Sequence, residues 1–245
     1  GYVGLPVAVA FSEAGFKVVA FDPTTKRINE LKEGHDKTFE IENNRLNNAN
    51  ISFTEKAEDI RHANFHIVTV PTPIDASKKP DLDPLLSASK TVGKALLKRS
   101  ENFNSNLKPI VIFESTVYPG ATEDICVPII EEYSKLIFNK DFFCAYSPER
   151  INPGDNLHKL TNIVKVTSGS TKESSEWVDK LYGSIIKAGT FNAKSIKVAE
   201  SAKVIENTQR DLNIAFMNEL EIMFDKFDLN FKEILQAAKT KWNFL

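Results

Sequence analysis

Short apolar runs rich in Val, Ile and Phe alternate with stretches of helical periodicity along most of the chain. An alternation of strands with helices of this kind is typical of βαβ units and predicts a parallel sheet with helices on both faces. The strands are predicted at residues 16–21, 65–70, 110–113, 142–145 and 163–166, and the helices at 5–14, 25–32, 84–97, 121–138 and 172–186. The Ser- and Asn-rich residues 100–106 are predicted to form a surface loop.

The periodicity changes after Ser195. Apolar residues then recur at the steps of one long amphipathic helix, and a second helix is predicted over 231–238. We therefore expect two domains, 1–193 and 194–245. Exposed aromatic residues at the last positions are unusual for the end of a domain, so we expect the chain to be truncated there. The long helix shows its apolar residues at Ala202, Ile205, Leu212, Phe216, Leu220, Met223 and Phe227.

Charge and composition narrow the classes of partner. The chain has 31 basic and 33 acidic residues and a mean hydropathy of −0.26, so no basic field exists to attract nucleic acid or anionic lipid. No apolar run has transmembrane length, and the first residues do not resemble a signal peptide. We therefore expect no nucleic-acid partner, no membrane association and a cytoplasmic location.

Cysteine and histidine usage gives no sign of a disulfide framework or a metal site. Cys126 and Cys144 lie inside apolar runs, which is typical of buried structural thiols in a reducing compartment. The histidines have no ligand spacing, and we interpret them as structural or surface residues and expect no bound metal. They are His35, His62, His66 and His158.

The first residues, GYVGLP, match the second half of a G-x-G-x-x-G dinucleotide fingerprint. Such glycines let the backbone approach a pyrophosphate at a helix N-terminus. Gly1 and Gly4 alone are a weak signal, but a helix and then a strand ending at Asp22 follow, where a carboxylate would bind the adenosine ribose. The alternative for Asp22, a turn-forming residue before Pro23, is less favoured by this context. The first glycine and the strand before it are absent, so we expect a doubly wound sheet without its first strand.

Three polar loops follow predicted strands, at the sheet edge where open α/β folds bind ligands. They are 70–73 (VPTP), 114–120 (ESTVYPG) and 147–154 (SPERINPG). The first two are explained equally well as turns built from Pro and Gly. The third offers a carboxylate, a guanidinium and an amide within four residues, at Glu149, Arg150 and Asn152, as a phosphate- and sugar-binding loop requires.

On the long helix, Lys203, Asn207 and Arg210 have the spacing i, i+4 and i+7 and therefore share one stripe. Spacing alone favours a solvated helix face. Polar residues between apolar anchors would also suit the wall of a polar cleft, so both interpretations stay open here.

Taken together, these motifs and the segment 199–208 (AESAKVIENT) resemble the UDP-glucose/GDP-mannose dehydrogenase family, in the same order and over the whole chain. The segments 147–154 and 206–213 (ENTQRDLN) further resemble the branch that acts on UDP-N-acetylhexosamines. The resemblance implies an NAD-binding Rossmann-like domain followed by part of an α-helical central domain. It also implies a UDP-sugar substrate, whose C6 alcohol is oxidised by NAD to a carboxylate through a thiohemiacetal and a thioester on a cysteine. The UDP-uronic acid would serve surface polysaccharide synthesis.

The resemblance also implies roles for individual residues. Thr116 would position the catalytic water and cofactor, Glu149 would act in thioester hydrolysis, Lys203 would stabilise the oxyanion and Asn207 would bind the sugar. The cofactor residues implied are Gly1, Tyr2, Val3, Gly4, Asp22, Arg27, Pro71, Thr72 and Thr116. The substrate residues implied are Glu149, Arg150, Asn152, Lys203, Asn207 and Arg210.

The chain departs from the family pattern at both ends. The family's Gly-Gly-His-Cys segment, which carries the nucleophile, follows a stretch like the final KWNFL, and neither Cys126 nor Cys144 has that context. The C-terminal domain that binds the nucleotide sugar is absent too, so we expect the 245-residue chain alone to be inactive.

Alternatives remain on both substrate and class. UDP-glucose or GDP-mannose would be the substrate in other branches of the family. A β-hydroxyacid-type dehydrogenase would share the glycine turn and a helical Lys and Asn, but it leaves the SPER loop unexplained. In another class, the chain would be a non-catalytic module for cofactor binding or dimerisation, because the family forms homodimers through its long central helix.

Overall fold

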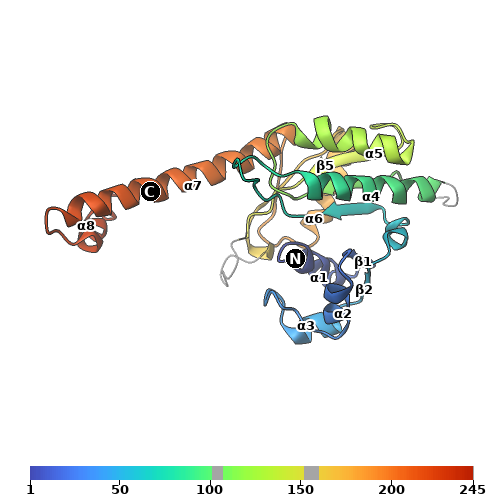
Figure 1. Ribbon diagram of the computed structural model, residues 1–245, viewed down its shortest axis with the longest axis horizontal. Helices are drawn as coiled ribbons and strands as arrows, with labels where there is room; N and C mark the ends of the chain where they lie inside the picture. Colours follow the sequence, from blue (N-terminus) through green and yellow to red (C-terminus); the bar gives the residue numbers. More distant parts are fainter. Residues whose placement is uncertain (101–106, 152–159, 245) are drawn as a thin grey trace. The chain divides into compact units, whose positions relative to one another are not determined.

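The computed structural model describes residues 1–100, 107–151 and 160–244 (Figure 1). The helices are α1 (Gly4–Glu13), α2 (Thr25–Lys32), α3 (Asn43–Asn48), α4 (Asp83–Ser100), α5 (Val127–Ser134), α6 (Lys172–Gly183), α7 (Ile196–Asp225) and α8 (Phe231–Ala238). The strands are β1 (Val18–Phe21), β2 (Ile51–Thr54), β3 (Phe65–Val68), β4 (Ile110–Phe113), β5 (Phe143–Tyr146), β6 (Lys165–Thr167) and β7 (Thr190–Asn192). Short turns of helix lie at Ala57–Ile60, Thr122–Cys126 and Leu160–Asn162.

Within the described residues, the pairs between the named strands are all parallel, as the alternating pattern predicts. The pairs form three groups, β1-β2, β3-β4-β5 and β6-β7. In the order 3-2-1-4-5-6 of a doubly wound sheet, the first strand would stand between the strands labelled β1 and β3. Those two strands do not pair with each other here. The fold is an α/β fold of the doubly wound class. The β1-β2 pair and the β3-β4-β5 sheet lie on the two sides of the position that the first strand would take in that order.

Helices cover both faces of β3-β4-β5. On one face, Val111 and Phe113 of β4 pack in one cluster with residues of α4 and α5, which run side by side in Figure 1. On the other face, Ile110 and Ile112 pack with residues of α1 and α6. Because successive strand residues point to opposite faces, a strand buried on both faces must be apolar throughout, and all of β4 is buried. This sandwich fixes the strand ends that carry the polar loops.

The helix predicted over 121–138 starts where predicted, at Ala121, but ends four residues early, and its first part is not α-helical. The chain forms a π-helical turn at Thr122–Cys126, and the α-helix begins at Val127 and ends at Ser134. Pro128 has no N–H to donate to the residue four positions earlier, which accounts for a change of helical pattern at this point. Lys135 then takes a left-handed conformation with φ of 61°, which ends the helix.

The other differences from the prediction concern short helices and strands and the residues at which helices end. The pattern missed β2, β7 and α3, and Ser100 ends α4 rather than beginning a loop. The rest of the predicted loop, 101–106, lies outside the described residues. Strands β6 and β7 form a two-stranded pair apart from β3-β4-β5, with Lys165 in register with Thr190.

The chain divides into two compact units, Gly1–Ser201 and Ala202–Leu245. The second unit holds most of α7, and α8 begins at the N-cap Asn230, whose side chain accepts from Lys232 N. Many apolar side chains of α7 are exposed, among them Ile205, Leu212 and Phe216. The boundary predicted between 193 and 194 stays a prediction.

Cys126 and Cys144 are fully buried, as predicted. Burial raises the pKa of the Cys126 thiol to about 11 and also raises the pKa of the Cys144 thiol well above its usual value. Across the described ranges, the structure contains no group of three or more His, Cys, Asp or Glu side chains that would hold a metal ion. Among the same residues, no helix is long and apolar enough to cross a membrane.

His66 of β3 is a buried histidine without a hydrogen-bond partner on either ring nitrogen. Burial, helped by the nearby Arg99 cation, lowers its pKa from 6.5 to about 4, so the folded protein holds the neutral ring. A lowered pKa means that the stabilisation is complete above pH 6.5 and is lost as the pH falls toward 4.

We expect the free energy of unfolding to fall by about 3 kcal/mol over that interval on account of His66. The measurement is urea unfolding at pH 7 and pH 4.5 for the parent, for His66→Leu and for His35→Leu, whose histidine is exposed. His66→Leu should lose part of the acid sensitivity, while His35→Leu should retain it. An equal pH dependence in all three proteins would contradict the prediction.

Candidate functional site

The start of α1 is suited to an anion. A Cβ on Gly4 would lie 2.5 Å from Thr69 Oγ1, so the residue that follows β3 lies directly against the first turn of α1. Val3, at the N-cap, makes no side-chain capping bond, and the first turn carries no acidic residue. The N–H groups of this turn and the helix dipole are therefore suited to a phosphate.

Asp22 directly follows β1, and Arg27 lies in α2, which begins three residues later. Both lie near Gly1: burial lowers the pKa of its amino group, the Arg27 cation adds to that shift, and the Asp22 carboxylate opposes it. One carboxylate oxygen of Asp22 accepts from Thr24 N at 2.8 Å, which is the turn contact considered in the sequence. Arg27 is buried, and its Nη2 donates to Asp36 Oδ1 at 2.6 Å. Burial alone would raise the pKa of Asp36, but hydrogen bonds from Arg27 and Thr38 lower it.

Two polar side chains join the loops after β3 and β4. Thr72 Oγ1 donates to the carbonyl of Thr116 at 2.7 Å, and Ser115 Oγ donates to the carbonyl of Val70 at 2.6 Å. The bonds link residues more than forty positions apart. The predicted cofactor residues Pro71, Thr72 and Thr116 therefore meet at one strand edge. These loops are thus more than independent Pro and Gly turns.

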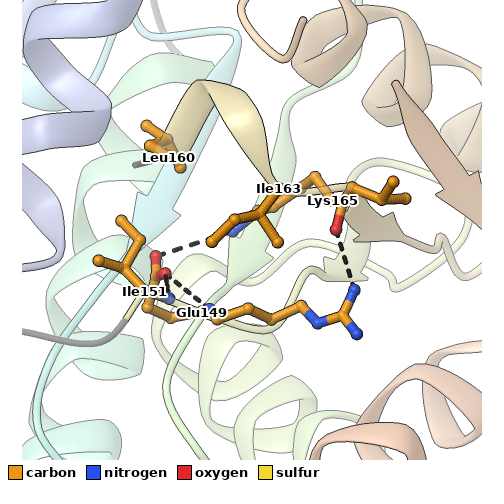
Figure 2. Close-up of a pocket in the computed structure, with 7 residues that line it drawn as sticks. Glu149, Ile151, Leu160, Ile163 and Lys165 are labelled. Carbon is orange, nitrogen blue, oxygen red and sulfur yellow. Dashed lines mark hydrogen bonds and ion pairs between the residues drawn. The ribbon is translucent and has the colours of Figure 1, made fainter. Parts of the chain in front are cut away.

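Glu149 follows β5 in the third loop and is buried. Its Oε1 accepts from the backbone N–H groups of Arg150 and Ile151, at 2.6 and 2.5 Å. Its Oε2 lies 4.0 Å from Lys165 Nζ, and Figure 2 shows the two side chains in one small hollow with Ile151. Arg150 donates through Nη1 to Val164 O at 2.9 Å.

A buried charged group beneath this loop was not predicted. Lys165 Nζ donates to Glu114 Oε2 at 2.8 Å, and the Tyr182 hydroxyl donates to Glu114 Oε1. Burial raises the pKa of Glu114, and the neighbouring Lys165 cation opposes that shift. Burial and the Glu114 charge also raise the pKa of Tyr182 well above its usual value. The sequence held one signal, a lysine within the apolar run 163–166.

Glu200 ties the second loop to α7. Its two carboxylate oxygens accept from the N–H groups of Gly120, at 2.6 Å, and of Thr122, at 3.0 Å. Burial raises the pKa of Glu200, and these two backbone contacts oppose the shift. The turn that begins with Thr122 therefore receives its cap from a residue some eighty positions away.

The second unit carries Lys203, Asn207 and Arg210 on α7. Asn207 Oδ1 accepts from Arg210 Nη2 at 2.7 Å, so these two residues share one helix face as the spacing predicts. Lys203 and Asn207 are half-buried, whereas Arg210 is exposed. Asn152, the remaining predicted substrate residue, lies outside the described residues.

The parallel α/β sandwich, the open helix start and the polar strand ends together define a dinucleotide-binding domain of the dehydrogenase class. The chain belongs to the UDP-glucose/GDP-mannose dehydrogenase family. Residues 1–186 match the family's NAD binding domain, and residues 197–244 match its central domain. The cofactor is therefore NAD.

Curated relatives match the chain from end to end. It is 56% identical to Protein CapL of Staphylococcus aureus, covering 100% of this chain and 55% of the relative. It is also 56% identical to the UDP-N-acetyl-D-glucosamine 6-dehydrogenase of Pseudomonas aeruginosa, covering 100% of this chain and 56% of the relative. The chain thus spans little more than half the length of these relatives.

Solved structures have the same fold. The UDP-D-ManNAc dehydrogenase of Pyrococcus horikoshii superposes with a TM-score of 0.88 at 31% identity, over 99% of this chain and 56% of the other. A GDP-mannose dehydrogenase from Pseudomonas aeruginosa, solved as a ternary complex, also gives 0.88, over the same shares. Because the identity to this second structure is only 20%, the comparison shows a shared fold and nothing more.

Proposed function

We propose that the natural-length protein containing this chain oxidises the C6 alcohol of a UDP-N-acetylhexosamine to a carboxylate, with NAD+ as acceptor. The observation that carries the proposal is the 56% identity, over the whole chain, to a UDP-N-acetyl-D-glucosamine 6-dehydrogenase. Identity to the UDP-N-acetyl-D-mannosamine dehydrogenases compared with it is 31 to 34%. UDP-N-acetylglucosamine is therefore the first substrate to test. The UDP-uronic acid would serve surface polysaccharide synthesis in the cytoplasm.

The strand ends fit a dinucleotide. The uncapped first turn of α1, with Gly1, Tyr2, Val3 and Gly4 before and within it, would hold the pyrophosphate. Other contacts would come from Asp22, Pro71, Thr72 and Thr116, which follow the ends of β1, β3 and β4, and from Arg27 of α2. NAD+, when bound, supplies the hydride acceptor.

The remaining predicted residues would act on the sugar. Glu149 would take a proton from the water that hydrolyses a thioester, and Thr116 would orient that water. Lys203 would stabilise the oxyanion through its ammonium, and Asn207 would hydrogen-bond the sugar. Arg150, Asn152 and Arg210 would contact the nucleotide sugar. The structure supports the Glu149 assignment through its buried, amide-bound carboxylate.

A second function, subunit association, is supported by exposed apolar residues of α7. Ile205, Leu212 and Phe216 are 66, 64 and 56% exposed in the single chain. Apolar side chains at helical spacing favour a second copy of the same helix as their cover. We propose a homodimer through α7, and a monomer in light scattering of the natural-length protein would contradict it. A non-catalytic module would dimerise without oxidising any sugar.

A substrate panel tests the catalytic proposal. We expect kcat/KM of the natural-length protein to be at least about tenfold higher with UDP-N-acetylglucosamine or UDP-N-acetylgalactosamine than with UDP-glucose or GDP-mannose. A discrimination of that size corresponds to about 1.4 kcal/mol in transition-state binding. A preference for UDP-glucose would move the protein to another branch of the family.

Asp22 should set the preference for NAD over NADP. Its carboxylate, at the end of β1, would bond the ribose diol and repel a 2′-phosphate. Asp22→Ala in the natural-length protein should lower the NAD to NADP preference at least about tenfold, because it removes both effects. The measurement is kcat/KM for each cofactor. Asp211→Ala, at an exposed position of α7, is the control. An unchanged preference in Asp22→Ala would show that the carboxylate serves only the turn to Thr24.

A further inference from the structure

Lys165 is the buried cation at the centre of the group beneath the 147–151 loop. Its side chain is 4% exposed, and Glu114 and Tyr182 beside it are also buried. A buried lysine requires an opposite charge to offset the cost of removing its ammonium from water. The Glu114 carboxylate supplies that charge, with 2.8 Å between Lys165 Nζ and Glu114 Oε2. If pairing with Glu114 were the whole role of Lys165, no further contact would be needed.

Lys165 also holds the loop that carries Glu149. Its Nζ donates to the carbonyl of Pro148 at 3.2 Å and lies 4.0 Å from Glu149 Oε2. The ammonium thus contacts the residue before Glu149 and faces the Glu149 carboxylate itself (Figure 2). The opposite oxygen, Oε1, accepts from the amides of Arg150 and Ile151. The carboxylate is consequently held from two sides.

The rest of the group fixes the position of the ammonium. The Tyr182 ring lies over Lys165, with 5.1 Å from Nζ to the ring centroid, and its hydroxyl donates to Glu114. The backbone of Lys165 starts β6, in register with Thr190 of β7. The backbone of Lys165 is held in β6 and its ammonium is held by Glu114 and Tyr182. The ammonium therefore stays in place and restrains the loop that contacts it.

We infer that Lys165 is a positioning residue, whose ammonium acts directly on the Pro148 carbonyl and the Glu149 carboxylate to hold that carboxylate in its working orientation. The inference rests on the proposed function only in assigning catalytic work to Glu149. Sub-ångström placement of a reacting group matters because a displacement of about 1 Å can cost about a hundredfold in rate.

The first test follows the loop directly and does not depend on turnover. Hydrogen exchange of the Arg150 and Ile151 amides is measured in the natural-length protein and its Lys165→Met and Lys165→Arg variants. We expect exchange at least tenfold faster in Lys165→Met and partial restoration in Lys165→Arg. Lys172→Met, at a side chain that is 92% exposed, should match the parent. Unchanged exchange in Lys165→Met would overturn the inference.

Lys165→Met leaves the Glu114 carboxylate buried without its partner, which could destabilise the folded protein. Glu114→Gln with Lys165→Met removes both charges of the pair and avoids that penalty. Glu114→Gln alone retains the ammonium beside Glu149. We expect the single variant to keep the amide protection and the double variant to lose it. Equal protection in the two would show that Lys165 serves Glu114 alone.

Turnover supplies the second test. Lys165→Met should lower kcat on UDP-N-acetylglucosamine by on the order of a hundredfold, with KM within about twofold. In a Glu149→Gln background it should cost nothing further, because residues that act as a unit are not additive. A further large loss in that background would contradict positioning through Glu149. If the parent protein oxidises no UDP-sugar, the proposed function fails, and hydrogen exchange still decides the role of Lys165.

Discussion

The 245-residue chain by itself is expected to form no NADH from any nucleotide sugar. The proposed oxidation requires a thiolate that holds the aldehyde as a hemithioacetal, from which a second hydride can leave. Cys126 and Cys144 are both buried, and burial raises the pKa of each thiol, to about 11 for Cys126. A thiol of that pKa is almost wholly protonated at neutral pH and is a poor nucleophile.

The measurement is NADH absorbance with UDP-N-acetylglucosamine, for this chain and for the natural-length protein side by side. Circular dichroism of both establishes that the shorter protein is folded. We expect a signal from the natural-length protein only, and replacing Cys126 and Cys144 with serine there should leave kcat within about threefold. Sustained NADH formation by the 245-residue chain would show that the nucleophile lies within it.

Lys203→Ala is expected to lower kcat of the natural-length protein by on the order of a hundredfold, the loss typical of one oxyanion contact. Stability should change little, because Lys203 is only half-buried on α7. KM for the UDP-sugar should change far less than kcat, since the oxyanion exists only in the transition state.

The matched control for this change is Lys226→Ala, at an exposed lysine one residue beyond the end of α7. It removes the same charge from the same unit and should keep the parent kcat. Thermal unfolding of the two variants separates a loss of catalysis from a loss of fold. A folded Lys203→Ala protein with near-parent kcat would contradict the catalytic role. Lys203 and Asn207 would then belong to a solvated helix face, the interpretation that their spacing alone favours.

Periodicity predicted the elements that are decided locally. The ranges of β4, α2 and α8 agree with the predicted ones, because apolar runs and helical spacing are uninterrupted there. Strand β7 was missed because it has only three residues, of which Phe191 is 61% exposed, and it depends on its pairing with β6. The end of α5 depends on a left-handed Lys135, which no pattern indicated.

The site divides in the same way. The places of Asp22 and of the Glu149 loop after strands, and of the glycine turn at the start of a helix, could be predicted because each is a compact local motif; the roles assigned to them stay predictions. The contact of Lys165 with Glu114 joins residues 51 positions apart and exists only once β4 and β6 are placed. Glu200 likewise caps Gly120 across 80 positions. Long-range partners of this kind follow from topology, and a single sequence carries little information about them.

The central claim is a four-electron oxidation of a UDP-N-acetylhexosamine by NAD+. The measurement that tests it most directly is the number of NADH molecules formed per UDP-N-acetylglucosamine consumed by the natural-length protein, with the product identified by mass spectrometry. We expect two NADH for each sugar and a UDP-linked uronic acid as product, because an alcohol loses two hydrides on its way to a carboxylate. One NADH for each sugar, or none with any UDP-sugar, would contradict the account.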